Sequence, residues 1–199
     1  MKLISFTLDE KETYGVVTDD NKVLDLGAAL GPDYPDLMSV LAAQHTSIVN
    51  EALTGHAADL DFADLALLPV IPNPGKIFCI GLNYDDHVKE TKKEKTEAPT
   101  IFTRFAESQV AHGDAIVLPP ESIKLDYEGE IAVIIGKPGR RISEEAAWDH
   151  IAGYACYNDG SIRDWQTATS QWIPGKNFYR TGGFGPWMVT ADQIAPNQE

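Results

Sequence analysis

The segment DYEGEIAVII, residues 126–135, places two carboxylates one residue apart at the start of an apolar run. Because side chains alternate between the two faces of a β-strand, Glu128 and Glu130 are expected on one side, with Ala132 and Ile134 continuing that face into the core. Two such carboxylates repel each other, so they need a cation or a shared proton. A hard divalent cation with oxygen ligands meets that need. Two solvated glutamates at a frayed strand end are the alternative, and the spacing alone favours neither.

A third carboxylate, Asp159, follows the apolar run GYACY and precedes Gly160. Asp before Gly at a strand end most often forms a turn. Polar residues follow it directly, at Ser161, Arg163, Asp164 and Gln166. Three carboxylates at strand ends, completed by water, suit Mg²⁺ or Mn²⁺, with Ca²⁺ as a further hard cation. The sequence therefore offers Glu128, Glu130 and Asp159 as candidate metal ligands.

His87 and Glu90 lie three residues apart in GLNYDDHVKE, where a helix would make them neighbours. A carboxylate beside an imidazole orients the ring and raises its basicity, as a general base requires. An exposed ion pair without a function is the alternative. Two basic residues are also candidates. Arg104 lies in the apolar run IFTRF and requires an anion, while Lys176 lies in the loop PGKNF, where it reaches inward or remains solvated.

These side chains come from distant parts of the chain, so several strands must bring them together. Short apolar runs bounded by turn residues predict strands at residues 2–8, 13–18, 22–26, 77–80, 100–105, 115–118, 127–135, 151–158 and 187–190. Helices are expected after Asp36, near residues 48–55, and after Ser143, since Asp and Ser side chains cap helices. Many short strands with few helices predict an α+β, mostly β fold, built as a roll or barrel.

The stretch PVIPNPG, residues 69–75, contains three prolines and a glycine and predicts a linker. We therefore expect a small N-terminal α+β domain, residues 1–70, without visible chemistry. The second domain, residues 71–199, contains all of the candidate residues.

The amino-acid composition limits the classes of molecule that the protein is expected to bind. The 199 residues are 43% hydrophobic and 23% charged, as in a soluble globular protein. The net charge of −14 argues against nucleic acid and against an anionic membrane surface. A small anionic substrate would have to be attracted by a local cation. Two cysteines, Cys79 and Cys156, cannot form a disulfide framework, and the N-terminus lacks a signal-like apolar stretch, so a cytoplasmic protein is expected.

From Lys76 to Ile194 the chain resembles the fumarylacetoacetate hydrolase family. The resemblance depends on seven ordered motifs rather than on any single one. They are IGLNYDDHVKE (80–90), PTIFTR (99–104), VLPP (117–120), DYEGEIAVIIG (126–136), GYACYNDGSIRDWQ (153–166), GKNF (175–178) and GPWMVT (185–190). Residues 1–70 are similar, less distinctively, to the small N-terminal domain of many members.

The resemblance implies a mixed β-sandwich roll with Mg²⁺ or Mn²⁺ at its mouth, and a homodimer. It implies that Glu128, Glu130 and Asp159 ligate the metal, and that His87 and Glu90 form a dyad that activates water. It also implies substrate contacts from four further side chains, those of Arg104, Arg163, Gln166 and Lys176.

The activity expected from this resemblance is hydrolysis of a carbon–carbon bond in a small oxo-acid, such as an acylpyruvate or another 1,3-dicarbonyl compound. The metal would stabilise the enolate that develops, His87 would deprotonate a water, and Lys176 would help to hold the negative charge. Isomerisation or tautomerisation of an oxo-acid, or its decarboxylation, on the same metal is the first alternative. A metal-binding protein without turnover is the second.

One departure from the family concerns length. Family members generally continue beyond the GPWMVT motif with further strands and a Thr-Gly-Thr-Pro-like loop, which this sequence lacks before Glu199. On this resemblance the sequence is expected to lack the C-terminal part of the catalytic domain.

Overall fold

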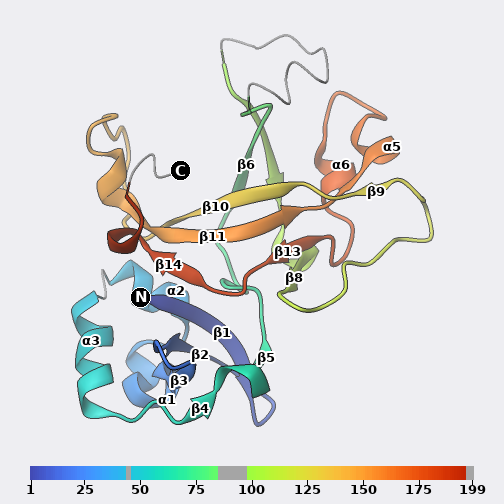
Figure 1. Cartoon of the computed structure of the whole chain (residues 1–199). Coiled ribbons are helices and arrows are strands. Elements are labelled where there is room, and N and C mark those ends of the chain that lie inside the picture. The colour runs from blue at the N-terminus through green and yellow to red at the C-terminus, as the bar shows by residue number, and fades with distance from the viewer. Residues whose placement is uncertain (44–45, 85–97, 196–199) are drawn as a thin grey trace.

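The computed structural model describes residues 1–43, 46–84 and 98–195 (Figure 1). The chain forms many strands and short helices, which confirms a mostly β fold with some helix. In chain order the strands are β1 (Lys2–Leu8), β2 (Lys11–Val17), β3 (Lys22–Asp25), β4 (Leu60–Asp61), β5 (Ala66–Leu67), β6 (Ile77–Gly81), β7 (Thr100–Arg104), β8 (Gln109–Ala111), β9 (Leu125–Asp126), β10 (Gly129–Ile135), β11 (Ile151–Asp159), β12 (Ser161–Ile162), β13 (Gly182–Phe184) and β14 (Met188–Thr190). The helices are α1 (Leu26–Leu30), α2 (Leu37–Ala42), α3 (Thr46–Gly55), α5 (Arg163–Gln166) and α6 (Ile173–Lys176), and 3₁₀ turns lie at Gly31–Asp33, Phe62–Asp64, Ala106–Ser108, Ala147–His150 and Ala191–Gln193.

Ten of the strands in the described ranges form one sheet. Its order is β4-β3-β2-β1-β14-β11-β13-β8, with β10 beside β11 and β5 beside β1. The pairs are antiparallel except for β13 and β8, which run parallel. Strands β6 and β7 form a separate antiparallel ribbon, and Figure 1 shows it running across the direction of β10 and β11. This crossing arrangement brings the ends of β7, β10 and β11 into one region.

The first helices close the N-terminal part of the core. Asp36 caps α2 by accepting a hydrogen bond from the backbone N–H of Ser39 at 2.7 Å, as its sequence position predicted. Helix α2 then buries Leu37, Val40 and Leu41. These side chains belong to a core that also includes residues of β10, β11, β13 and β14.

Strand β1 links the two predicted domains directly. It pairs with β14 in the register Lys2↔Val189 and Leu3↔Met188, so residues from both sides of the 69–75 stretch share one sheet. Leu3 and Met188 are fully buried in the same core. The division into residues 1–70 and 71–199 remains a prediction, but the two parts share a continuous hydrophobic core.

Two predicted elements differ from the structure. Residues 115–118 do not form a strand, although Val117 N–H donates to the Arg180 carbonyl at 3.0 Å, because no neighbouring strand continues that single bond. Strand β8, which the pattern did not predict, lies just before. The helix expected after Ser143 is a 3₁₀ turn, Ala147–His150. Ser143 does accept from the Ala146 N–H at 3.4 Å, but β11 begins at once after this turn.

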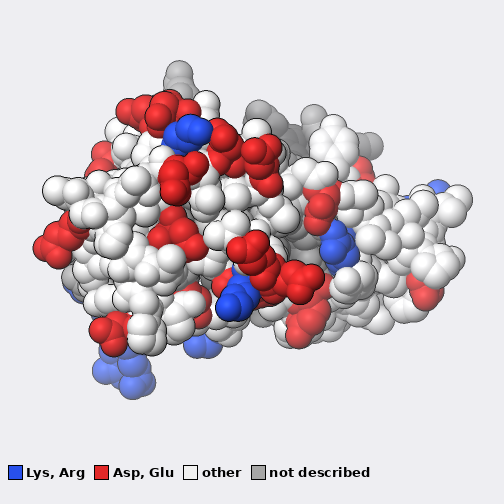
Figure 2. All heavy atoms as spheres, turned by 90° about the horizontal axis from the view of Figure 1, so that it is seen from below, with Lys and Arg blue, Asp and Glu red and all other residues white. Residues whose placement is uncertain are grey.

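The surface is acidic. Figure 2 shows Asp and Glu side chains spread over the face that is lowest in Figure 1, with fewer Lys and Arg residues among them. None of the helices in the described ranges combines the length and apolar character needed to cross a bilayer.

Candidate active site

Adjacent strands bring the predicted carboxylates together. Glu128 lies directly before β10 and Glu130 within it, and both side chains are half-buried, whereas Ile131 on the other face is 67% exposed. Strand β11 pairs with β10 and ends at Asp159, which is 5% exposed. The Asp159 N–H donates to the Glu128 carbonyl at 2.8 Å. The alternation expected from the sequence therefore places Glu128 and Glu130 on the face that Asp159 closes.

Five charged side chains form a string of alternating sign, in the order Arg163, Glu128, Lys176, Asp159, Arg104. Arg163 Nη1 donates to Glu128 Oε1. Lys176 Nζ lies 2.6 Å from Glu128 Oε2 and 2.7 Å from Asp159 Oδ2. Arg104 Nη1 lies 2.5 Å from Asp159 Oδ1. Each carboxylate is thus held on both oxygens by a different cation.

Lys176 reaches inward rather than into solvent. Its side chain is 1% exposed, and the ammonium lies 5.0 Å from the centroid of the Phe102 ring. The preceding Gly175 allows this approach, since a Cβ there would lie 2.3 Å from the backbone nitrogen of Gln166. A buried ammonium requires paired partners, and Glu128 and Asp159 supply them.

Arg104 is fully enclosed by protein groups. Its side chain is 0% exposed. Besides Asp159, its guanidinium donates to Ser108 Oγ at 3.2 Å, to the Gly160 carbonyl at 3.1 Å and to Thr181 Oγ1 at 2.9 Å. The partners of Arg104 in the described chain are therefore acceptors in the protein itself.

Arg163 lies nearer the rim, with its side chain 33% exposed. Its guanidinium donates to Asp126 Oδ2 at 2.9 Å and to Gln166 Oε1 at 2.9 Å, in addition to Glu128. Gln166 is buried at the end of α5. Asp126 is a contact that the sequence analysis missed, although it begins the same DYEGE motif. Its position two residues before Glu128 was the available signal.

The surroundings shift the pKa values of Glu128 and Glu130 in opposite directions. Burial tends to raise the pKa of Glu128, but the hydrogen bonds and charges of Lys176 and Arg163 outweigh it and lower that pKa. Burial raises the pKa of Glu130, and the charges of Glu128 and Asp159 add to this effect. A hydrogen bond with the Tyr84 hydroxyl opposes the rise without cancelling it. Of the two glutamates, Glu130 is therefore the one whose ionised form its surroundings disfavour.

The donor chemistry fits a hard divalent cation. Within residues 1–43, 46–84 and 98–195, no group of three or more His, Cys, Asp or Glu side chains is spaced to hold a metal ion, because Glu128 and Asp159 turn onto Lys176 and Glu130 onto Tyr84. All three carboxylates are oxygen donors, however, and two of them already converge on one positive charge. Glu130, whose ionised form the neighbouring carboxylates disfavour, would gain from a further cation.

Two predicted residues, His87 and Glu90, lie outside the described part of the chain. The sequence analysis placed Cys79 among residues outside the site and made no prediction for Tyr157. The Cys79 thiol on β6 has its pKa raised to about 12, chiefly by burial and next by the charge of Asp159. The Tyr157 hydroxyl is buried and has no hydrogen-bond partner among the described residues, and the Arg104 guanidinium lies 5.9 Å from its ring centroid. No sequence pattern indicates that Cys79 lies near Asp159 or that Tyr157 lies near Arg104, because both contacts depend on how the strands pack.

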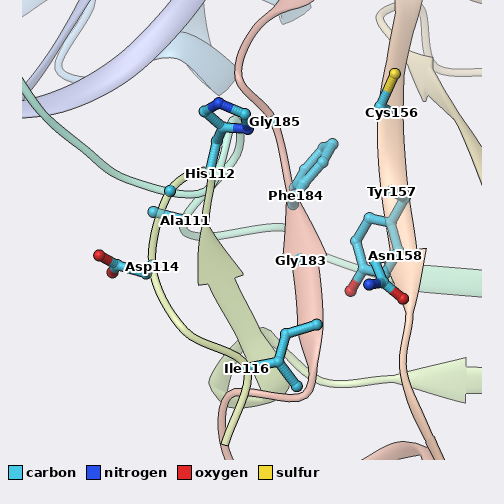
Figure 3. Close-up of a pocket in the computed structure, with 11 residues that line it drawn as sticks. Ala111, His112, Asp114, Ile116, Cys156, Tyr157, Asn158, Gly183, Phe184 and Gly185 are labelled. Carbon is cyan, nitrogen blue, oxygen red and sulfur yellow. The ribbon is translucent and has the colours of Figure 1, made fainter. Parts of the chain in front are cut away.

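A pocket of about 260 Å³ is lined by residues of β8, β11 and β13 and of the segment that follows β8 (Figure 3). Residue alternation along β11 places Cys156 and Asn158 on the face opposite Asp159, and these two residues line the pocket together with His112 and Phe184. Figure 3 shows the Cys156 sulfur and the His112 ring at the same end of this pocket. None of the predicted metal ligands lines it.

A family model and a curated relative point to the same protein family. A protein-family model described as fumarylacetoacetate (FAA) hydrolase C-terminal matches residues 76–199. The mitochondrial oxaloacetate tautomerase fahd2 of Xenopus laevis is 36% identical over 203 residues, covering 98% of this chain and 63% of its own. The chain therefore spans less than two thirds of the length of this relative.

Solved structures agree on the fold. A protein of Mycobacterium smegmatis is 32% identical, with a TM-score of 0.82 over 98% of this chain and 68% of its own. Maleylpyruvate hydrolase from Sphingobium sp. SYK-6, solved with manganese(II) and pyruvate, is 25% identical, with a TM-score of 0.77 over 98% of this chain and 69% of its own.

Proposed function

Because the chain belongs to the fumarylacetoacetate hydrolase family, we propose that it is a metal-dependent tautomerase that interconverts the keto and enol forms of a small 2-oxo dicarboxylic acid such as oxaloacetate. This choice reverses the order expected from the sequence, where hydrolysis came first. The relative from Xenopus laevis is named as an oxaloacetate tautomerase and aligns with 98% of the chain.

The observation that carries the proposal is the convergence of Glu128 and Asp159 on one buried ammonium, with Glu130 on the same face. An all-oxygen donor set of this kind suits Mg²⁺ or Mn²⁺. We assign Glu128, Glu130 and Asp159 as the ligands. Bound there, the divalent cation would supply Lewis-acid stabilisation for negative charge on the oxo oxygen of the substrate.

The remaining residues have roles in binding and proton transfer. Lys176, buried where the effective dielectric constant is low, would add its positive charge to that of the bound cation and so help to attract a carboxylate of the substrate. Arg163, partly exposed at the start of α5, and Gln166, which accepts a hydrogen bond from it, are placed to bind the second carboxylate of a dicarboxylic acid. In the proposed reaction His87, oriented by Glu90, takes a proton from the carbon beside the oxo group and gives that proton to the oxo oxygen, which regenerates the base; the reverse transfer converts the enol to the keto form. General-base catalysis of this kind contributes about 10²–10⁴-fold.

Hydrolysis of an acylpyruvate is the second candidate. It is favoured by the structural likeness to maleylpyruvate hydrolase, solved with manganese(II) and pyruvate. In that reaction His87 would deprotonate a water, the water would attack a carbonyl carbon, and the carbon–carbon bond would break. Decarboxylation would need no attacking water, and a protein that only binds metal would turn over neither class of substrate.

One experiment separates these activities. Metal-stripped protein is supplied with Mg²⁺ or Mn²⁺ and tested on enol oxaloacetate, followed by its ultraviolet absorbance, and on a panel of acylpyruvates in ¹⁸O-labelled water. We expect faster loss of the enol signal without ¹⁸O in the product, and loss of this activity in a Glu128→Ala/Glu130→Ala double variant. Incorporation of ¹⁸O into the newly formed carboxylate of a cleaved acylpyruvate would identify a hydrolase instead. Release of carbon dioxide would identify a decarboxylase.

The predicted homodimer also remains a proposal. The outer face of β10 exposes Ile131, Val133 and Ile135, at 67%, 49% and 62%. An apolar strand face of this kind favours association with another protein surface. If a second copy covers it, Ile131→Glu should lower the mass measured by light scattering. An unchanged mass would place the contact elsewhere.

A further inference from the structure

We propose that Arg104 is a positioning residue that fixes the carboxylate of Asp159, rather than a residue that contacts the substrate. The inference deepens the proposed function, because Asp159 is assigned there as a metal ligand. The sequence analysis expected Arg104 to bind substrate, since a basic residue in an apolar strand requires an anion. The structure identifies an anion within the protein itself, Asp159 Oδ1 at 2.5 Å.

The donors of Arg104 are already directed at protein acceptors. A guanidinium has five N–H groups in a rigid planar fork. Nε donates to Ser108, Nη1 donates to Asp159 and to the Gly160 carbonyl, and Nη2 donates to Thr181. The side chain is 0% exposed. Four of the five N–H groups therefore have protein acceptors, and the enclosed position of the side chain leaves a substrate little access to the guanidinium.

The acceptors around Arg104 are themselves held in place. Ser108 Oγ donates to the Phe105 carbonyl at 2.8 Å, and Thr181 Oγ1 donates to the Phe178 carbonyl at 2.8 Å. These bonds orient each hydroxyl oxygen with its lone pairs toward the guanidinium. The hydroxyls thus act as fixed acceptors rather than as mobile partners.

Strand β13 also restricts the guanidinium. A Cβ at Gly182 would lie 2.8 Å from Arg104 Nη2 and 2.3 Å from the Tyr157 hydroxyl, so glycine is what makes room for both groups. The Tyr157 ring lies beside the guanidinium, with 5.9 Å between Cζ and the ring centroid, which is within the range of a cation–π contact. We call Ser108, Tyr157, Thr181 and Gly182 the Arg104 socket.

The consequence concerns the geometry of Asp159. Its Oδ1 is paired with Arg104, which the Arg104 socket holds in place, whereas its Oδ2 is paired with Lys176, the cation that it shares with Glu128. A carboxylate fixed at one oxygen presents the other in a constant direction. Residues that orient metal ligands in this way typically change metal affinity about 10–100-fold when mutated. A lysine would retain the charge of Arg104 but could not reproduce its planar set of donors.

The test measures Mn²⁺ and oxalate binding separately. Mn²⁺ is titrated calorimetrically into metal-stripped parent and Arg104→Lys protein, and oxalate is then titrated into each Mn²⁺-saturated form. We expect Arg104→Lys to weaken Mn²⁺ binding about 10–100-fold and to alter the Mn²⁺ electron paramagnetic resonance spectrum, while the oxalate affinity stays within about twofold. Arg180→Lys is the matched control, since the Arg180 side chain is 35% exposed and pairs only with Asp114 among its described ion pairs, and it should leave both affinities unchanged.

Two milder variants cover the case in which Arg104→Lys does not fold. Thr181→Val and Ser108→Ala each remove one acceptor of the Arg104 socket and retain the Asp159 pair, so each should weaken Mn²⁺ binding several-fold. Unchanged Mn²⁺ affinity in every folded variant overturns the positioning role. Unchanged Mn²⁺ affinity with lost oxalate binding in Arg104→Lys would assign Arg104 to the substrate. If the parent binds no Mn²⁺, the metal assignment in the proposed function fails first, and this inference fails with it.

Discussion

Glu128 and Asp159 share one ammonium: Lys176 Nζ lies 2.6 Å from a carboxylate oxygen of the first and 2.7 Å from one of the second. Glu128 lies directly before β10 and Asp159 is the last residue of β11, so they meet where β10 begins and its antiparallel neighbour β11 ends. Lys176 arrives from α6, 17 positions after Asp159 in the chain. The stability of the region around Glu128 and Asp159 therefore depends on the buried ammonium of Lys176, which pairs with both carboxylates.

Replacing Lys176 by Met should destabilise the protein strongly. The change leaves two close carboxylates without their common cation, and breaking a buried ion pair costs about 3–5 kcal/mol. Urea unfolding monitored by circular dichroism measures the loss in the free energy of unfolding. Lys22→Met is the control, because its pair with Asp61 is exposed and such pairs contribute little. Equal effects of the two substitutions would contradict a structural role for the buried pair.

Replacing His87 by Ala should reduce turnover about 10²–10⁴-fold without changing Mn²⁺ affinity. The reason is that His87 is proposed to move a proton, whereas the proposed metal ligands are Glu128, Glu130 and Asp159. Steady-state kinetics on oxaloacetate and calorimetric Mn²⁺ titration measure the two effects. Glu90→Gln should produce a smaller loss, because it would weaken only the orientation of the imidazole. Turnover that survives His87→Ala would remove the dyad from the mechanism.

Neutral substitutions at the two glutamates should change stability in opposite directions at neutral pH, in metal-stripped protein. The pKa of Glu130 is raised in the folded state, so its ionised form disfavours folding, and Glu130→Gln should raise the free energy of unfolding. The pKa of Glu128 is lowered, so its ionised form favours folding, and Glu128→Gln should reduce that free energy.

Acidification gives a further check on these signs. The stability that Glu128 contributes is present above its ordinary pKa of 4.5 and is lost as the pH falls through its lower folded value. The penalty from Glu130 is present above its raised pKa and disappears as the pH falls below 4.5. Both differences from the parent should therefore shrink in acid. Urea unfolding at several pH values measures them, and effects of the same sign for both variants would show that the charges do not act as described.

The two thiols should react at very different rates. Cys156 is exposed, whereas Cys79 is partly buried and burial raises its pKa to about 12. Since the thiolate is the reactive form, a chromogenic disulfide reagent at pH 8 should label Cys156 rapidly and Cys79 slowly. Cys156→Ser should leave only the slow phase, and a fast phase persisting in that variant would show Cys79 to be accessible. Unfolding in urea should make both thiols react quickly.

The sequence was sufficient for features that depend on local pattern. The shared face of Glu128 and Glu130 follows from the two-residue period of a strand, and the Asp36 cap follows from its position before an apolar helix. The mostly β fold follows from the density of short apolar runs. Residues 115–118 have the composition of a strand but pair with no strand in the described part of the chain, so the local pattern predicted a strand that does not form.

Local sequence patterns could not predict contacts between segments that lie far apart in the chain. Whether Lys176 lies in solvent or in the core depends on Gly175 packing against α5, and no periodicity encodes that contact. The partners of Arg104 lie 4, 55 and 77 positions away, at Ser108, Asp159 and Thr181. Sequence spacing therefore indicated that Arg104 needs an anion but could not say whether the anion belongs to the protein or to a ligand.

The alternating string of charges also bears on how quickly an anion arrives. Three cations, those of Arg104, Arg163 and Lys176, face four carboxylates, those of Asp126, Glu128, Glu130 and Asp159, so this corner has no excess of positive charge within a chain of net charge −14. A dicarboxylate diffusing toward it is repelled by the rest of the surface, and dissolved salt screens that repulsion over a distance of about 8–10 Å. The encounter of protein and substrate should accordingly become faster as ionic strength rises.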